Sequence, residues 1–159
     1  MQTKQIALNP KVCAKSATIM QPSNLYGCEI GEHVFVGPFC EIQEDVKIGA
    51  YTRIQSHSFI CSLVSIGAHC FIGHGVMFIN DTFSEGMPAA DKNQWKNTFI
   101  SDFVSIGSNA TILPVYICQR VVIGAGSVVT KDIHKSGFYA GNPARFLRPI
   151  ESMQIPQDR

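Results

Sequence analysis

A large apolar residue recurs every six positions through the first half of the chain. The series from residue 30 to residue 78 is Ile30, Val36, Ile42, Ile48, Ile54, Ile60, Ile66, Ile72 and Phe78. A second series starts at Ile100 and continues through Ile106 and Ile112. A period of six does not suit a helix, because the apolar face of a helix returns every three to four residues.

The six-residue repeat instead predicts a short strand followed by a corner. The aliphatic side chain points inward and a small residue, four places later, fits beside it. Glycine often follows the aliphatic residue, and it permits backbone angles that a side chain would resist. Three such units would close one triangular coil, and stacked coils would pair their strands in parallel. A β-sandwich would need alternating polarity and hairpin turns, which the sequence lacks.

This pattern resembles the hexapeptide-repeat proteins, from about residue 12 to residue 148. The resemblance implies an all-β fold, a left-handed parallel β-helix. The left hand comes with the family, since the general rule for parallel crossovers gives the opposite hand. We expect a single β-helix domain over residues 1–159, one external loop at about 81–97 and a short C-terminal tail at 149–159.

Two irregularities interrupt the repeat. From Ile112 to Ile117 the step is five residues, which predicts a tightened corner and places the bulky Tyr116 where a small residue is usual. From Phe78 to Ile100 the step is 22 residues, which is not a multiple of six. The second irregularity predicts that an external loop replaces one strand. Long loops in compact folds are usually functional.

Charge and composition exclude several classes of protein. The chain has 13 basic and 12 acidic residues, so no clustered basic face for nucleic acid is expected. No apolar run is long enough for a membrane span, and the first residues lack the apolar stretch of a signal peptide. We therefore expect a cytoplasmic protein. Its six cysteines form no CxxC pair, which favours free thiols that serve as small apolar residues.

Three classes of β-helix protein remain: an acyltransferase, a γ-class carbonic anhydrase and a structural or assembly protein. His33, His69 and His74 are separated by 36 and 5 residues, like the zinc ligands of the carbonic anhydrases. Their register differs, because His33 and His69 lie one step out of phase with the position that the family uses. We expect no metal, and the γ-carbonic-anhydrase-like protein stays as an alternative.

The C-terminal third resembles the coenzyme A end of hexapeptide acetyltransferases. The matching stretches are "VIGAGSVVTKDI" (residues 122–133) and "AGNPARFLR" (residues 140–148). The resemblance implies acetyl-CoA as cosubstrate, and the basic residues would meet its phosphates by charge-assisted hydrogen bonds. The positions that it assigns to coenzyme A are Ser108, Ala125, Thr130, Lys131, Arg145 and Arg148.

The stretch "FIGHGVMFIND" (residues 71–81) resembles the dTDP-3-amino-3,6-dideoxyhexose 3-N-acetyltransferases. Those enzymes share the Asn-Asp pair that opens a polar loop and a tryptophan near its end, here Trp95. The resemblance implies that Asn80 lies against a sugar amine, that the acceptor is a nucleotide-linked amino sugar, and that the setting is lipopolysaccharide or O-antigen biosynthesis. After the pair this chain has "TFSEG", where relatives often have an aromatic residue, proline and arginine. A sugar O-acetyltransferase is the alternative.

The mechanism implied is direct attack of a neutral sugar amine on the acetyl thioester in a ternary complex. His57 is the first candidate for a general base, Asp81 the second and His74 the third. Counting by eighteens puts His57 and His74 at one corner and Asn80 at the next. They would meet only across a subunit boundary, and since β-helix acetyltransferases are typically trimers, we expect a homotrimer.

Overall fold

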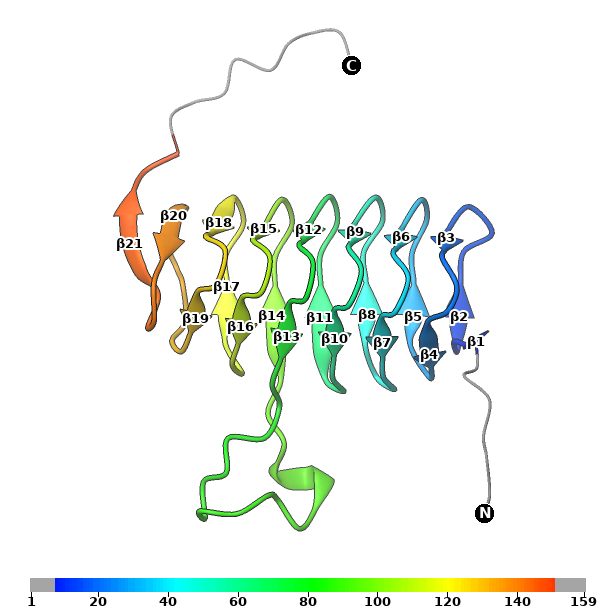
Figure 1. Ribbon diagram of the computed structural model, residues 1–159, viewed down its shortest axis with the longest axis horizontal. Helices are drawn as coiled ribbons and strands as arrows, with labels where there is room; N and C mark the ends of the chain where they lie inside the picture. Colours follow the sequence, from blue (N-terminus) through cyan, green and yellow to red (C-terminus); the bar gives the residue numbers. More distant parts are fainter. Residues whose placement is uncertain (1–7, 151–159) are drawn as a thin grey trace, which may run out of the picture.

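The described part of the chain, residues 8–150 of the computed structural model, is a column of stacked triangular coils (Figure 1). Each full coil contributes one short strand to each of three sheets, called here A, B and C. The three corners between consecutive sheets are named the A–B, B–C and C–A corners. This is the all-β parallel β-helix that the six-residue repeat predicts.

The strands are short, and most are two residues long. Sheet A contains β1 (Leu8–Asn9), β4 (Asn24–Tyr26), β7 (Glu41–Ile42), β10 (Phe59–Ile60), β13 (Met77–Phe78), β16 (Thr111–Ile112) and β19 (Val128–Val129). Sheet B contains β2 (Val12–Cys13), β5 (Glu29–Ile30), β8 (Lys47–Ile48), β11 (Val64–Ile66), β14 (Thr98–Ile100) and β17 (Tyr116–Ile117). Sheet C contains β3 (Thr18–Ile19), β6 (Phe35–Val36), β9 (Arg53–Ile54), β12 (Phe71–Ile72), β15 (Ser105–Ile106), β18 (Val121–Ile123), β20 (Gly137–Ala140) and β21 (Arg145–Arg148).

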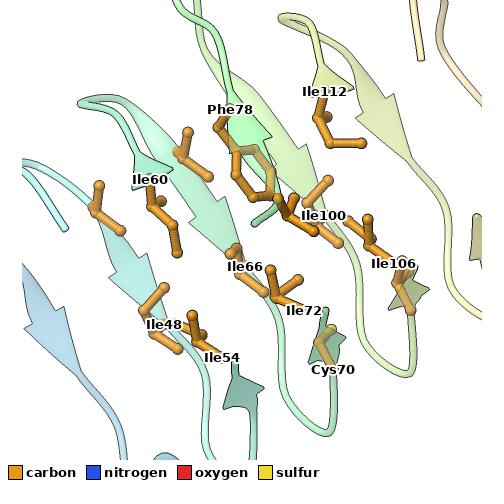
Figure 2. Packing of buried hydrophobic residues seen from close by; sticks show 14 of the residues in the cluster. Ile48, Ile54, Ile60, Ile66, Cys70, Ile72, Phe78, Ile100, Ile106 and Ile112 are labelled. Carbon is orange, nitrogen blue, oxygen red and sulfur yellow. The ribbon is translucent and has the colours of Figure 1, made fainter. Parts of the chain in front are cut away.

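The aliphatic residues of the repeat stack in register and form the core. In sheet B, Ile66 pairs with Ile48 on one side and with Ile100 on the other. In sheet C, Ile72 pairs with Ile54 and Ile106 in the same way. These side chains point into the column in Figure 2 and are almost fully buried. Their burial supplies the main stabilisation of the fold, since the hydrophobic effect scales with the apolar area removed from water.

The external loop spans residues 79–97, between β13 and β14, and projects from the A–B corner (Figure 1). It contains one 3₁₀ turn, η1 (Lys92–Gln94). Sheet B continues without a gap, because Ile66 pairs directly with Ile100. The prediction that the loop replaces a strand is therefore wrong. The extra residues are inserted at a corner, and every coil keeps its three strands.

The five-residue step is a shortened corner, as predicted. Ile117 pairs with Ile100, so the shorter step leaves the core in phase. Val115 is buried beneath the corner, and Tyr116 points outward from sheet B next to Phe99. Val115 therefore fills the small inward place, and the prediction that Tyr116 takes it is wrong.

The B–C corner carries a column of stacked rings. His33, Tyr51, His69 and Phe103 lie in successive coils, with ring centroids 4.8 Å, 5.0 Å and 5.0 Å apart. Each has a positive φ between 55° and 60°, a conformation that L-residues adopt at a cost and that this stacking offsets. His33 and His69 share one column, as their spacing predicts, but the ring of Tyr51 separates them. His74 lies at a different corner.

Four of the six cysteines are buried, and all six are free thiols, as predicted. At its C-terminal end the column is capped by β20 and β21, which pair antiparallel beside β18. Between residues 8 and 150 the structure has no helix of the length and hydropathy that a membrane crossing requires. The last nine residues of the predicted C-terminal tail, 151–159, lie outside the described residues.

Candidate functional site

The C–A corner brings four of the predicted site residues into one row. His57 lies between β9 and β10, His74 between β12 and β13, Ser108 between β15 and β16, and Ala125 between β18 and β19. Backbone hydrogen bonds connect these corners from coil to coil. The N–H of Asn109 donates to the carbonyl of His74 at 2.7 Å, for example. The row therefore runs parallel to the column axis.

Small residues and backbone form the C-terminal part of this row. A Cβ on Gly73 would lie 2.6 Å from the backbone nitrogen of Ser108, and a Cβ on Gly107 would lie 2.5 Å from that of Ala125. Only glycine fits these two positions, because real side chains do not approach backbone so closely. Ser108 and Ala125 on this corner carry small side chains, so they form a smooth wall that suits a slim arm.

The two histidines of the row have different neighbours. His74 is exposed, and its Nδ1 lies 2.9 Å from Ser56 Oγ in the preceding coil. His57 is also exposed, has a φ of 64°, and stacks on Phe39 with ring centroids 5.0 Å apart. Of these two histidines, His74 is the one whose ring is oriented by a side-chain hydrogen bond. The spacing of 18 between Ser56 and His74 is one coil, so the sequence contains the signal for this contact.

The A–B corner holds Asn80, where the external loop begins. Asn80 Nδ2 donates to the carbonyl of Ser62 at 3.2 Å, and the carbonyl of Asn80 accepts from the N–H of Lys96 at 2.9 Å. The two ends of the loop are thus joined at Asn80. Thr130 and Lys131 lie at the same corner after β19, toward the C-terminal end, and both are exposed.

Asp81 holds the loop in shape. Its Oδ1 accepts the N–H of Phe83 at 2.9 Å, and its Oδ2 accepts the N–H of Ala89 at 2.8 Å. Both carboxylate oxygens are therefore engaged by the backbone of the loop. This arrangement makes Asp81 an organiser of the loop, while the histidines present ring nitrogens at an open surface.

A pocket of about 270 Å³ lies between the loop and the A–B corner. The loop contributes Lys92 and Trp95, and the corner contributes Glu44, Asp45 and Ser62. Lys92 Nζ forms an ion pair with Glu44 and lies 5.7 Å from the centre of the Trp95 ring. Since Ser62 accepts the hydrogen bond from the side chain of Asn80, the pocket adjoins Asn80.

The two predicted arginines lie on β21, in the hairpin that caps the column. Arg148 stacks over Phe138, with its guanidinium carbon 3.7 Å from the ring centre, and Arg145 is exposed. The hairpin is anchored because the N–H of Ala144 donates to the carbonyl of Val128 at 2.8 Å. The residues predicted to bind coenzyme A are therefore divided among the C–A corner, the A–B corner and this hairpin.

One chain does not bring the two corners together. His74 and Asn80 stand at opposite ends of β13, and six residues of extended chain span up to about 20 Å. His57 and His74 meet at one corner, and Asn80 and Trp95 meet at another. The larger hollow, about 680 Å³, lies on sheet B near the B–C corner between Phe99 and Tyr116 and contains none of the predicted site residues. Between residues 8 and 150 no cluster of three or more His, Cys, Asp or Glu side chains could hold a metal ion.

Two family models match the chain. Residues 27–62 match "Bacterial transferase hexapeptide (six repeats)", and residues 102–131 match "Hexapeptide repeat of succinyl-transferase". Among curated proteins, YvoF of Bacillus subtilis, which is provisionally named an acetyltransferase, is 46% identical over 56 residues. That stretch is 35% of this chain and 33% of YvoF, so the match spans about a third of the relative's length.

Two solved structures resemble most of the chain. The N-acyltransferase AntD of Bacillus cereus, in complex with dTDP-4-amino-4,6-dideoxyglucose and coenzyme A, has a TM-score of 0.70 and 25% identity. The match covers 91% of this chain and 83% of AntD. The hexapeptide-repeat acetyltransferase VCA0836 of Vibrio cholerae, complexed with acetyl coenzyme A, has a TM-score of 0.60 and 26% identity, over 82% of this chain and 72% of VCA0836.

Proposed function

We propose that this member of the hexapeptide-repeat family is an acetyl-CoA-dependent N-acetyltransferase acting on a nucleotide-linked amino sugar. The observation that carries this proposal is the row on the C–A corner, where a smooth wall at Ala125 and Ser108 leads directly to His74. A cosubstrate arm along that wall would deliver its thioester to a side chain able to accept a proton. The ligands of AntD and VCA0836 support this choice of substrates.

In this proposal the smooth wall holds the pantetheine arm, with Lys131 and Arg145 at its phosphate-bearing end. Both basic side chains are exposed and lie toward the C-terminal end of the column. Charge-assisted hydrogen bonds to phosphate are among the stronger polar contacts available to a protein. The thioester would then lie farther along the row, toward His74.

We further propose that the active site lies between two copies in a homotrimer, where the A–B corner of one faces the C–A corner of the next. In a cyclic trimer whose axis runs along the column, residues of the same coil lie at the same level. Asn80 and His74 belong to one coil, at the two ends of β13. His57 belongs to the preceding coil, about 4.8 Å away, so this arrangement favours His74 as the partner of Asn80.

The proposed reaction needs one bond formed and one broken. The neutral amine nitrogen attacks the thioester carbonyl carbon, the carbon–sulfur bond breaks, and one proton passes from nitrogen to the departing thiolate. His74 can carry that proton, because its Nδ1 is held by Ser56 and its Nε2 is left to exchange. Asn80 orients the amine and takes no proton. The products are the acetamido sugar and free coenzyme A.

The test is a thiol-release assay with acetyl-CoA and a panel of dTDP- and UDP-linked sugars, each supplied in its amino form and its hydroxy form. The proposal expects turnover of amino sugars and little turnover of their hydroxy counterparts. Turnover of the hydroxy forms alone would make the protein an O-acetyltransferase. No thiol release with any acceptor, despite measurable acetyl-CoA binding, would contradict acetyl transfer to these sugars.

A further inference from the structure

The pocket between the external loop and the A–B corner already binds an ammonium group of the chain itself. Lys92 Nζ is paired with the Glu44 carboxylate and faces the ring of Trp95. A carboxylate and an aromatic face are the two groups that proteins use most often to hold an ammonium ion. The backbone of the loop keeps Lys92 and Trp95 close together, because the N–H of Trp95 donates to the carbonyl of Lys92 at 3.1 Å across η1.

The surroundings of the pocket carry more negative than positive charge. Asp45 lines the pocket beside Glu44, and its charge acts on Lys92 together with that of Glu44. The pKa of Tyr26 is raised by partial burial and by the nearby carboxylates of Glu41 and Glu44, while Lys92 opposes this shift. Lys92 is thus one cation facing two carboxylates, those of Glu44 and Asp45. A nucleotide diphosphate would be repelled here, whereas a second ammonium group would be attracted.

Lys92 is held loosely. The relative exposure of its side chain is 68%, and that of Glu44 is 44%. Ion pairs this exposed contribute little to stability, because water screens them and two flexible side chains must be ordered. A ligand that brings its own ammonium group would therefore displace Lys92 at little cost.

Resting on the proposed function, we propose that this pocket is the subsite that captures the acceptor's ammonium group, and that Lys92 occupies the place of that group in the empty protein. Glu44 and Asp45 pair with the incoming charge, and Trp95 lies against the sugar. A hydroxyl group would gain only a hydrogen bond at the same place. The pocket therefore selects amino sugars over their hydroxy counterparts before any chemistry takes place.

Asn80 connects this subsite to the reacting groups. Its side chain donates to Ser62, which lines the pocket. The acceptor arrives as an ammonium ion, the dominant form of an amine below its pKa. It becomes a nucleophile beside Asn80 after it has passed one proton to solvent water. Acceptor affinity should therefore fall as the pH rises above the pKa of the free amine.

The experiment uses the fluorescence of Trp95, the single tryptophan of the chain, without acetyl-CoA. D-Glucosamine and D-glucose are titrated into the wild-type protein at pH 6.5 and at pH 9.5. We expect a saturable change with glucosamine at pH 6.5, a weaker one at pH 9.5, and none with glucose. Equal responses to the two sugars, or equal affinity for glucosamine at both pH values, would overturn the proposal.

Variants distinguish binding of the ligand's ammonium group by the pocket from a role of Lys92 in anchoring the loop. Lys92→Ala should bind glucosamine about two- to fivefold more tightly, since an exposed competitor is removed. Glu44→Gln should bind it roughly tenfold more weakly, with Asp45→Asn as a second acidic variant. Lys96→Ala, at an exposed lysine of the same loop outside the pocket, is the matched control and should change nothing. Weaker binding by Lys92→Ala would make Lys92 a loop anchor and end the proposal.

The two proposals fail separately. If glucosamine binds as described but no acceptor is acetylated, the ammonium subsite stands and the proposed function falls. If amino sugars are acetylated and Glu44→Gln leaves their KM unchanged, the proposed function stands and the subsite falls.

Discussion

His74 and Ser56 form a hydrogen bond between their side chains at the C–A corner. A hydrogen bond to one imidazole nitrogen holds the ring in place and leaves the other nitrogen to exchange protons. We therefore expect His74→Asn to lower kcat by roughly 10²–10⁴-fold near neutral pH, the range typical of general-base catalysis. The loss should shrink as the pH rises, because more of the amine is then neutral without help. A pH–rate profile at saturating acetyl-CoA measures both effects.

His57→Asn is the matched control, since His57 lies on the same corner one coil away and stacks on Phe39. It should shift KM at most and keep the shape of the pH profile. Ser56→Ala should give an intermediate loss of kcat, because it frees the ring that Ser56 orients. A wild-type profile for His74→Asn together with a lost profile for His57→Asn would reverse this assignment and restore the order that the sequence suggests.

Two buried thiols should make the free energy of unfolding depend on pH in the alkaline range. Burial raises the pKa of Cys28 from 9.0 to about 11 and that of Cys61 to about 12. Each thiol stays neutral in the folded protein at a pH where the unfolded chain already ionises. Their contribution is complete below pH 9 and is lost as the pH rises through the folded pKa values. Urea unfolding should show the free energy of unfolding falling between about pH 9 and pH 11, with a smaller slope for Cys61→Ala than for the wild type.

At the scale of single elements, the strands were the most predictable feature. A six-residue period fixes which side chain points inward, so the inward stacking of Ile30, Ile48 and Ile66 follows from spacing alone. The corner contact between Ser56 and His74 also follows, because contacts at i and i+18 recur in every regular coil. A periodic sequence determines which residues contact each other in successive coils, as long as the period holds.

The external loop is where periodicity stops giving information. The sequence indicates its place and its functional character, but it suggests that the loop replaces a strand, whereas sheet B is continuous from Ile66 to Ile100. The pairing of Lys92 with Glu44 joins residues 48 apart across an irregular segment, and no repeat specifies that distance. The carboxylate of Asp81, a predicted base, is likewise committed to the loop by contacts that only the folded backbone reveals.

The hairpin of β20 and β21 and the last A–B corner should act as the phosphate-binding end. Arg145→Ala and Lys131→Ala should each weaken acetyl-CoA binding and leave the apparent affinity for the acceptor nearly unchanged. Loss of one charge-assisted contact costs about 1.5–3 kcal/mol when buried and less when exposed, as both residues are here. Calorimetric titration with acetyl-CoA measures this effect. Lys15→Ala, at an exposed lysine near the other end of the column, is the control, and unaltered affinity in both test variants would move the phosphate site elsewhere.

At the scale of the whole molecule, the two halves of the proposed site lie at different corners. The strands of the column are paired along its length, and His74 and Asn80 stand at opposite ends of β13. In the proposed homotrimer, a neighbouring copy would supply the missing half. Light scattering should therefore report a trimer, whereas a fully active monomer would contradict a shared site.

Subunit mixing tests the account most directly. One variant carries Asn80→Ala, the other carries both His57→Asn and His74→Asn, and each alone should be nearly inactive with an amino-sugar acceptor. Refolded together in equal amounts, mixed trimers contain one intact site in three. Random assembly should therefore restore about a quarter of wild-type thiol release. If the mixture stays as inactive as its parents although mixed trimers form, the site does not lie between copies, and the central claim is wrong.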